Sequence, residues 1–273
     1  MSDNSIKNNF FKKITFGGFF KKDVIELIKI NKYDRVYIDI NNNDVPEDVK
    51  YAKQLCNEDV KNVKQLCNMD INYAKQSHNI DVKYVQQLCN IDVIWTNIQD
   101  KVSDTENGKI TMIKRRLNIA KTLVEILRAE IQFNSRGIVL LDSDMWTMYP
   151  LSVYTTGNTS SNYTYYIKYA DKEYESSDVT SICYLARLKP TMFVNYYCMG
   201  TPMIIPSNYY DQMIYILKLY ISNMMYDKEP VDVYIHNKLS RNHLFINGIC
   251  HIIDGEEYCT RLTPQLEGIR RWR

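Results

Sequence analysis

The chain has 273 residues, of which 45% are hydrophobic and 24% charged, and its formal net charge is +2. A chain of this length can bury a substantial core. The near-neutral charge lacks the strong basic field typical of nucleic-acid-binding proteins, so we expect no nucleic-acid partner. No uninterrupted apolar stretch in the sequence approaches the about 20 residues that a membrane span needs.

The seven cysteines indicate a reducing compartment. Their number is odd, none forms a C-x-x-C pair and no signal peptide precedes them, so we expect free thiols and a cytoplasmic location. The low-complexity repeat described below and the abundance of asparagine and tyrosine suggest an AT-rich viral or parasite genome. For a viral protein the expected location is the host cytoplasm.

The first 40 residues predict a parallel β-α-β unit. Residues 14–16 predict a strand that runs into a loop at Gly17 and Gly18. Lysine and phenylalanine pairs surround this segment, and they leave open a peripheral contact with a membrane surface. Residues 23–29 predict a short helix with an acidic N-cap. Residues 35–40 predict a second strand, which ends in an acid and an asparagine-rich turn.

Residues 46–93 contain an internal repeat of eleven residues. Its four copies share a Lys/Gln-Gln-x-x-Asn sequence and begin at Lys53, Lys64, Lys75 and Gln86. Apolar residues recur at steps of three, four and four, which predicts a helical stripe. Each copy also carries an Asn-x-Asp, which is unfavourable inside a helix and can break the segment into short helices. We interpret the repeat as a surface helix expanded by duplication; the alternative is a ligand-binding array.

A third strand and a long helix follow the repeat. Residues 91–96 predict the strand, and residues 101–109 predict a polar loop. From residue 113 to residue 131 apolar positions recur at steps of four and three, which is typical of an amphipathic helix. Arg115 and Arg116 lie near the start of this helix.

The most informative segment is residues 137–144, an apolar run that ends in two carboxylates. It predicts a buried strand over residues 138–141, with Asp142 and Asp144 at its carboxyl end. In open α/β sheets, ligands bind outside the carboxyl ends of the strands. Carboxylates at positions i and i+2 can converge on one hard cation such as Mg²⁺ or Mn²⁺, which in turn holds phosphates. The alternative is that the two acids only cap the strand and begin a turn.

The second half of the chain offers fewer signals. Residues 193–206 place Gly200 between two apolar runs, which predicts a strand pair, either with its backbone close to a sugar or as a hairpin in the core. Residues 213–224 predict a helix whose apolar positions face the core.

The order of these elements resembles the nucleotide-binding half of the GT-A glycosyltransferases, in particular the broad class typified by family 2 enzymes. The likeness covers residues 14–150 and is weak beyond them. Four groups of residues carry it: the acidic strand end at Asp39 with the turn through Asp44, the helix start at Arg115 and Arg116, the DxD motif Asp142-Ser143-Asp144, and the acids Asp227, Glu229 and Asp232 before an apolar stretch.

The resemblance implies an α/β fold of GT-A type. Its central sheet is mostly parallel and flanked by helices, and the repeat at residues 46–93 forms a long helical insertion. Residues 1–150 form the nucleotide-sugar-binding half, and residues 151–273 form the acceptor-binding half of the same domain.

The resemblance also implies a donor site for a nucleoside diphosphate sugar. A Mn²⁺ or Mg²⁺ cofactor in that site neutralises the charge of the leaving diphosphate. The expected donor-binding residues are Asp39, Asp44, Arg115, Arg116, Asp142 and Ser143. The expected metal ligands are Asp142, Asp144 and His251. For each group a structural role is the alternative: a turn at Asp39, a solvated helix face at the arginines, and a satisfied structural histidine at His251.

Asp232 is the expected catalytic base, and Glu229 is the second candidate. In an inverting transfer, a carboxylate removes the proton of the acceptor hydroxyl while the diphosphate leaves from the opposite face. The predicted activity is that of a hexosyltransferase-type glycosyltransferase acting on a hydroxyl of a glycan, lipid or protein. Two alternatives stay open: a nucleotidyltransferase that makes the sugar nucleotide, and a noncatalytic protein whose repeat helix docks a partner.

Overall fold

Four parallel strands form one end of the central sheet. The computed structural model describes residues 9–17, 31–39, 92–100, 108–143, 145–156, 163–189, 192–197, 201–239, 241–246, 248–253, 256–262 and 267–272. The strands pair in the order β3-β2-β1-β4. Their bounds are β1 (Lys12–Phe16), β2 (Arg35–Asp39), β3 (Asp92–Thr96) and β4 (Gly137–Leu140). All four predicted strands are therefore confirmed, with ends that differ from the prediction by one or two residues.

The sheet continues beyond β4 with strands from the second half of the chain. β11 (Met203–Pro206) runs antiparallel between β4 and β9 (Val179–Lys189), and β10 (Met192–Tyr197) and β12 (Arg241–Phe245) pair with β9. The predicted pairing within residues 193–206 is wrong, because in the described residues β10 and β11 each pair with β9 and not with each other. Both halves of the chain share one sheet, which is mixed but parallel in its first four strands.

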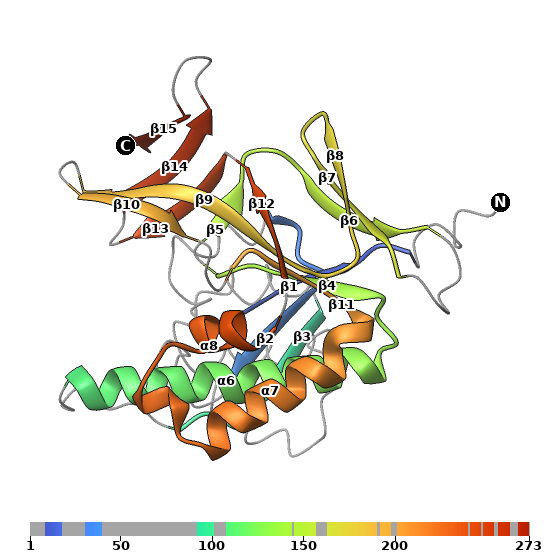
Figure 1. Cartoon of the computed structure of the whole chain (residues 1–273), viewed down its shortest axis with the longest axis vertical. Helices are drawn as coiled ribbons and strands as arrows, with labels where there is room; N and C mark the ends of the chain where they lie inside the picture. The colour runs from blue at the N-terminus through green and yellow to red at the C-terminus, as the bar shows by residue number, and fades with distance from the viewer. Residues whose placement is uncertain are drawn as a thin grey trace, which may run out of the picture.

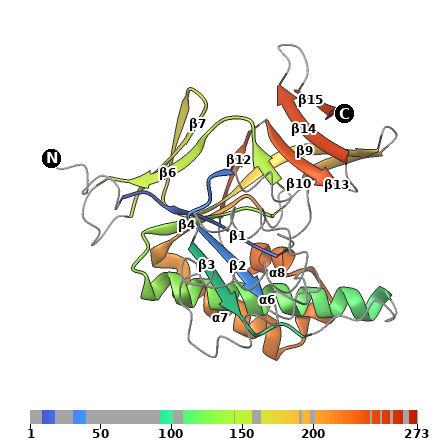
Figure 2. The ribbon, with the colours of Figure 1, turned by 180° about the vertical axis from the view of Figure 1, so that it is seen from behind.

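Helices cover one face of the parallel strands (Figures 1 and 2). α6 (Gly108–Gln132) lies beside α7 (Tyr210–Ser222), and α8 (Val231–Lys238) packs against both. The 3-10 turns η1 (Ser207–Tyr209) and η2 (Met225–Asp227) flank α7. Two predicted boundaries are wrong. α6 begins at Gly108, inside the loop predicted at residues 101–109. α7 ends at Ser222 and does not include Met224, which adopts a left-handed conformation with φ 52°.

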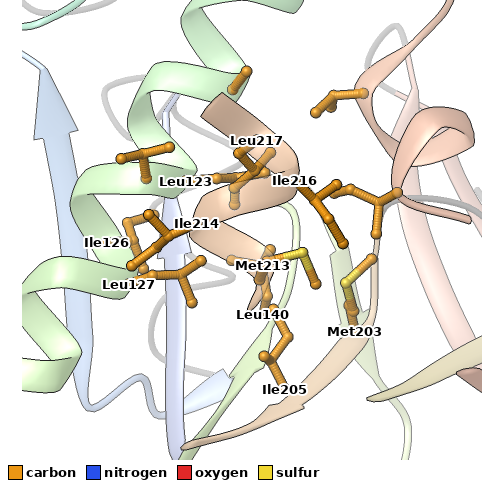
Figure 3. Packing of buried hydrophobic residues seen from close by; sticks show 14 of the residues in the cluster. Leu123, Ile126, Leu127, Leu140, Met203, Ile205, Met213, Ile214, Ile216 and Leu217 are labelled. Atoms are coloured by element: carbon orange, nitrogen blue, oxygen red, sulfur yellow. The ribbon is translucent and has the colours of Figure 1, made fainter. Parts of the chain in front are cut away.

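The core lies between these helices and the sheet. α7 buries residues at the spacing of one helix face, namely Tyr210, Met213, Ile214, Ile216, Leu217 and Tyr220. They pack against α6 and against the apolar side chains of β1, β4 and β11 (Figure 3). Burial of this apolar area is the main source of stability for the layer.

Two smaller sheets flank the central one. β5 (Met145–Thr147) pairs with β13 (Ile249–Ile253), and the sheet continues through β14 (Glu256–Leu262) and β15 (Glu267–Trp272). The other sheet is the meander β6 (Leu151–Thr155), β7 (Tyr165–Tyr169) and β8 (Lys172–Ser176). Every second residue of β6 is buried, as expected for a strand with one face on the core.

Several predictions fall outside the described residues: the helix at residues 23–29, nearly all of the repeat at residues 46–93, and Gly200. At the end of the repeat the structure does correct one point. Val93 was included both in the helical stripe and in the strand predicted over residues 91–96; it belongs to β3, where it pairs with Val36, so the strand prediction is correct.

Candidate functional site

Three segments meet at the carboxyl end of β4. The parallel register of β1 and β4 pairs Ile14 with Leu140, which brings Phe16 level with Asp142. The antiparallel register of β11 and β4 pairs Met203 with Leu140, which brings Thr201 level with Asp142 from the other side. Asp142 therefore lies at the sheet edge where ligands bind in open α/β folds.

A cavity of about 270 Å³ opens at this edge, between the sheet and the helices. Four polar residues line it: Arg116 from α6, Asp142 after β4, Thr201 before β11 and Asp232 from α8. The other lining residues are apolar, and Figure 3 shows several of them facing one another between α6, α7, β4 and β11. Residues predicted for donor binding, metal binding and catalysis thus share one cavity although they lie far apart in the sequence.

Of the two predicted arginines, only Arg116 lines the cavity. Arg115 is exposed, because neighbouring helix positions point about 100° apart. Arg116 is half-buried and donates from Nη1 to the carbonyl oxygen of Tyr226 at 3.3 Å. This bond ties α6 to η2 and holds the guanidinium beside the cavity.

The two predicted catalytic acids differ in position. Asp232, the second residue of α8, is half-buried and lines the cavity, whereas Glu229 is not among the lining residues. The Glu229 carboxylate accepts a hydrogen bond from Asn237 Nδ2 at 3.5 Å, and its backbone carbonyl accepts one from Tyr220 Oη at 2.6 Å. The geometry favours Asp232 over Glu229 as the acid that can reach a bound ligand.

Tyr220 lies among the charged groups of the site. Its side chain is fully buried, and burial raises the pKa of its phenol. The carboxylates of Asp232 and Glu229 raise that pKa further, whereas the Arg116 guanidinium lowers it. Tyr220 was predicted as a core residue of this helix, which its burial confirms. A single tyrosine at such a position carries no motif that would indicate its place beside charged groups.

Two buried side chains hold the backbone of the acidic turn. Met145 N donates to Asp142 O at 3.1 Å, which closes a tight turn over residues 142–145. Asn31 Nδ2 donates to Met145 O at 2.6 Å, and Tyr33 Oη donates to Asp142 O at 3.5 Å. Asn31 Oδ1 is buried and has no hydrogen-bond partner among the described residues. Neither Asn31 nor Tyr33 was predicted, since both precede β2 and lie more than 100 residues from the turn.

Asp39, the last residue of β2, stabilises the end of β3 and the segment that follows it. Its Oδ2 accepts hydrogen bonds from Thr96 Oγ1 at 2.8 Å, Ile98 N at 2.9 Å and Gln99 N at 3.2 Å. These bonds fix the chain where it leaves β3. The alternative of a turn formed with the asparagines at residues 41–43 lies outside the described residues. Asp39 does not line the cavity, so its donor-binding role stays a prediction, as does that of Asp44, which lies outside the described residues.

The predicted metal ligands are described only in part. Asp142 and Ser143 are half-buried in the acidic turn, whereas Asp144 and the side chain of His251 lie outside the described residues. The backbone of β13 pairs His251 with Met145, the residue that follows Asp144. Among the side chains that the structure does describe, no three from His, Cys, Asp and Glu lie close enough to hold one metal ion. The hard oxygen atoms of Asp142 fit Mg²⁺ or Mn²⁺ in chemistry.

No family model matches the chain. The chain is similar to an uncharacterized protein, ORF238, of Acidianus filamentous virus 2 (isolate Italy/Pozzuoli), with 26% identity over 155 residues. The match spans 57% of this chain and 57% of the viral protein. Among the helices of the described residues, none is long and apolar enough to cross a membrane.

Proposed function

We propose that the chain is a metal-dependent glycosyltransferase of GT-A type, which moves a sugar from a nucleoside diphosphate sugar to a hydroxyl acceptor with inversion. One observation carries the proposal: Arg116, Asp142 and Asp232 line one cavity at the carboxyl end of β4. The strand order β3-β2-β1-β4 supports it, because it leaves the carboxyl ends of β1 and β4 adjacent.

The donor half of the reaction uses the polar end of the cavity. Asp142, with Asp144 and His251, would hold Mn²⁺ or Mg²⁺, and this cation supplies positive charge for the departing diphosphate. Arg116 adds a second cationic group, and a guanidinium suits bidentate contact with phosphate oxygens. Asn31 and Tyr33 hold the backbone of the acidic turn, so the main chain that carries the carboxylate is in place before the donor binds.

The acceptor half of the reaction uses Asp232. Its carboxylate takes the proton of the acceptor hydroxyl while the hydroxyl oxygen forms a bond to the anomeric carbon. The bond from that carbon to the diphosphate oxygen breaks, and its electron pair leaves with the nucleoside diphosphate. Asp232 on α8 and Asp142 after β4 line the same cavity, so the base and the leaving group can act on one bound donor.

Calorimetric titration with UDP- and GDP-sugars, with and without Mn²⁺, tests the proposal. We expect metal-dependent binding of one donor that weakens at least about tenfold in Asp142→Asn and Asp144→Ala, since each change removes a ligand charge. Asp171→Asn, at an exposed turn between β7 and β8, is the matched control and should bind normally. Asp232→Asn should also keep donor binding but lose transfer.

Two results would contradict the glycosyltransferase proposal: no metal-dependent binding of any donor, or unchanged binding in Asp144→Ala. Release of pyrophosphate from a nucleoside triphosphate and a sugar phosphate would instead indicate the nucleotidyltransferase.

A further inference from the structure

The cavity behind Asp142 and Asp232 is much less polar than a sugar site requires. Twelve of its sixteen lining residues are apolar. Leu127 and Leu217, at its inner end, are fully buried and belong to the hydrophobic core. Sugars need many hydrogen-bond partners, and an apolar wall gives them none.

The polar and apolar lining residues lie at opposite ends. Along β11 the lining residues are Thr201, Met203 and Ile205, which share one face of the strand and cover about 13 Å. Thr201 lies level with Asp142 at the carboxyl end of β4, and Ile205 pairs with Ile138 near the amino end of that strand. The cavity therefore passes from a polar mouth to an apolar interior along this strand.

α6 shows the same gradient in the same direction. Its lining residues are Arg116, Ile119, Leu123 and Leu127, and the helix runs antiparallel to β4, which follows it. Arg116 therefore lies at the mouth with Asp142, and Leu127 lies at the inner end. The lining residues from β11 and from α6 therefore agree: charged and polar side chains lie at the opening of the cavity, and apolar side chains lie farther in.

From this arrangement we infer that the acceptor is an alcohol with one unbranched aliphatic chain, which occupies the cavity and leaves its hydroxyl at Asp232. The inference rests on the proposed function and names its acceptor class. Apolar cavities of about 150 Å³ stay dry and bind small apolar molecules, and this cavity is larger. The hydroxyl needs a polar neighbour, and Asp232 and Thr201 supply acceptors at the mouth.

A series of 1-alcohols from butanol to dodecanol tests the inference on the wild-type protein without metal or donor. Each added methylene should strengthen binding about threefold to fourfold until the cavity is full, after which the affinity should level off. Competition with a fluorescent alkyl probe measures the affinities. Binding that does not depend on chain length would overturn the inference.

Variants of α6 provide the structural control. Ile119→Trp places an indole in the cavity wall and should weaken binding of the longer alcohols at least about tenfold, because the aromatic ring fills space that the chain needs. Ile110→Trp on the same helix is the matched control, since Ile110 is half exposed and is not a lining residue. Equal binding by the two variants would overturn the inference.

A donor titration on the same proteins separates this inference from the proposed function. If a nucleotide sugar binds with Mn²⁺ but the alcohols show no dependence on chain length, the acceptor class is wrong and the glycosyltransferase proposal stands. If no donor binds, the proposed function fails and the acceptor role fails with it. Transfer of the sugar to decanol but not to ethanol would support both.

Discussion

At the scale of single residues, Glu130 near the end of α6 is a charged side chain buried in the protein. Its carboxylate is fully buried and accepts from Arg35 Nη1 at 2.8 and 3.0 Å and from Tyr37 Oη at 2.8 Å. The Arg35 guanidinium also lies 4.1 Å from the ring centroid of Phe133. Burial, and after it the Glu130 carboxylate, raises the pKa of the Tyr37 phenol. One charged residue near the end of α6 therefore joins that helix to β2.

Removing this charge tests the role of Glu130. Glu130→Gln should lower the free energy of unfolding by about 3 kcal/mol, because it leaves the Arg35 guanidinium without its counterion in a largely buried place. Glu125→Gln on the same helix is the control. Glu125 pairs with Arg128 in solvent, so its loss should change stability by less than about 0.5 kcal/mol. Urea denaturation measures both, and equal stabilities would contradict the assigned role.

At the scale of elements, α6 organises the first half of the site. It carries Arg116 at the cavity and anchors the chain that leaves β3. Asn118 Oδ1 accepts from Asp100 N at 2.9 Å, and Asn118 Nδ2 donates to Asp100 O at 2.8 Å. Lys121 adds an exposed ion pair with the carboxylate of Asp100. The helix thus holds the segment that Asp39 also fixes.

The two contacts to Asp100 should differ in strength. Asn118→Ala removes a buried pair of hydrogen bonds and should lower the free energy of unfolding by about 1–3 kcal/mol. Lys121→Ala removes only a solvent-exposed ion pair and should cost at most about 1 kcal/mol. Chemical denaturation of both variants measures the difference. A larger loss in Lys121→Ala would show that the ion pair, and not Asn118, holds the segment.

The elements also show where sequence patterns stop being informative. β4 was predictable because a strand buried on both faces appears as a short apolar run bounded by turns. The partners of β10 and β11 were not, because pairing depends on the eleven-residue strand β9, which carries no distinctive signal. Arg116, Asp142 and Asp232 were found through a motif-like pattern. Asn31 and Tyr33 were missed because they act through buried single contacts.

At the scale of the whole molecule, the acidic turn links two sheets. β4 belongs to the central sheet, β5 belongs to the sheet of β13–β15, and residues 141–144 connect them. A ligand on Asp142 and its predicted partners Asp144 and His251 would bind both sheets at once. The meander β6–β8 is a separate sheet, and none of its residues lines the cavity. Binding should therefore stabilise one flanking sheet and leave the other unchanged.

Hydrogen exchange can follow this difference. Mn²⁺ with the nucleotide sugar that binds best should slow amide exchange in peptides that cover β4–β5 and β13. At a ligand concentration of 100 times Kd the effect reaches about 100-fold, equivalent to about 2.7 kcal/mol, for amides that open only after the ligand leaves. Peptides from β7 and β8 serve as the internal control and should keep their rates. Equal protection of the meander would show that the ligand stabilises the molecule as a whole, and unchanged exchange at β4–β5 would place the ligand away from the acidic turn.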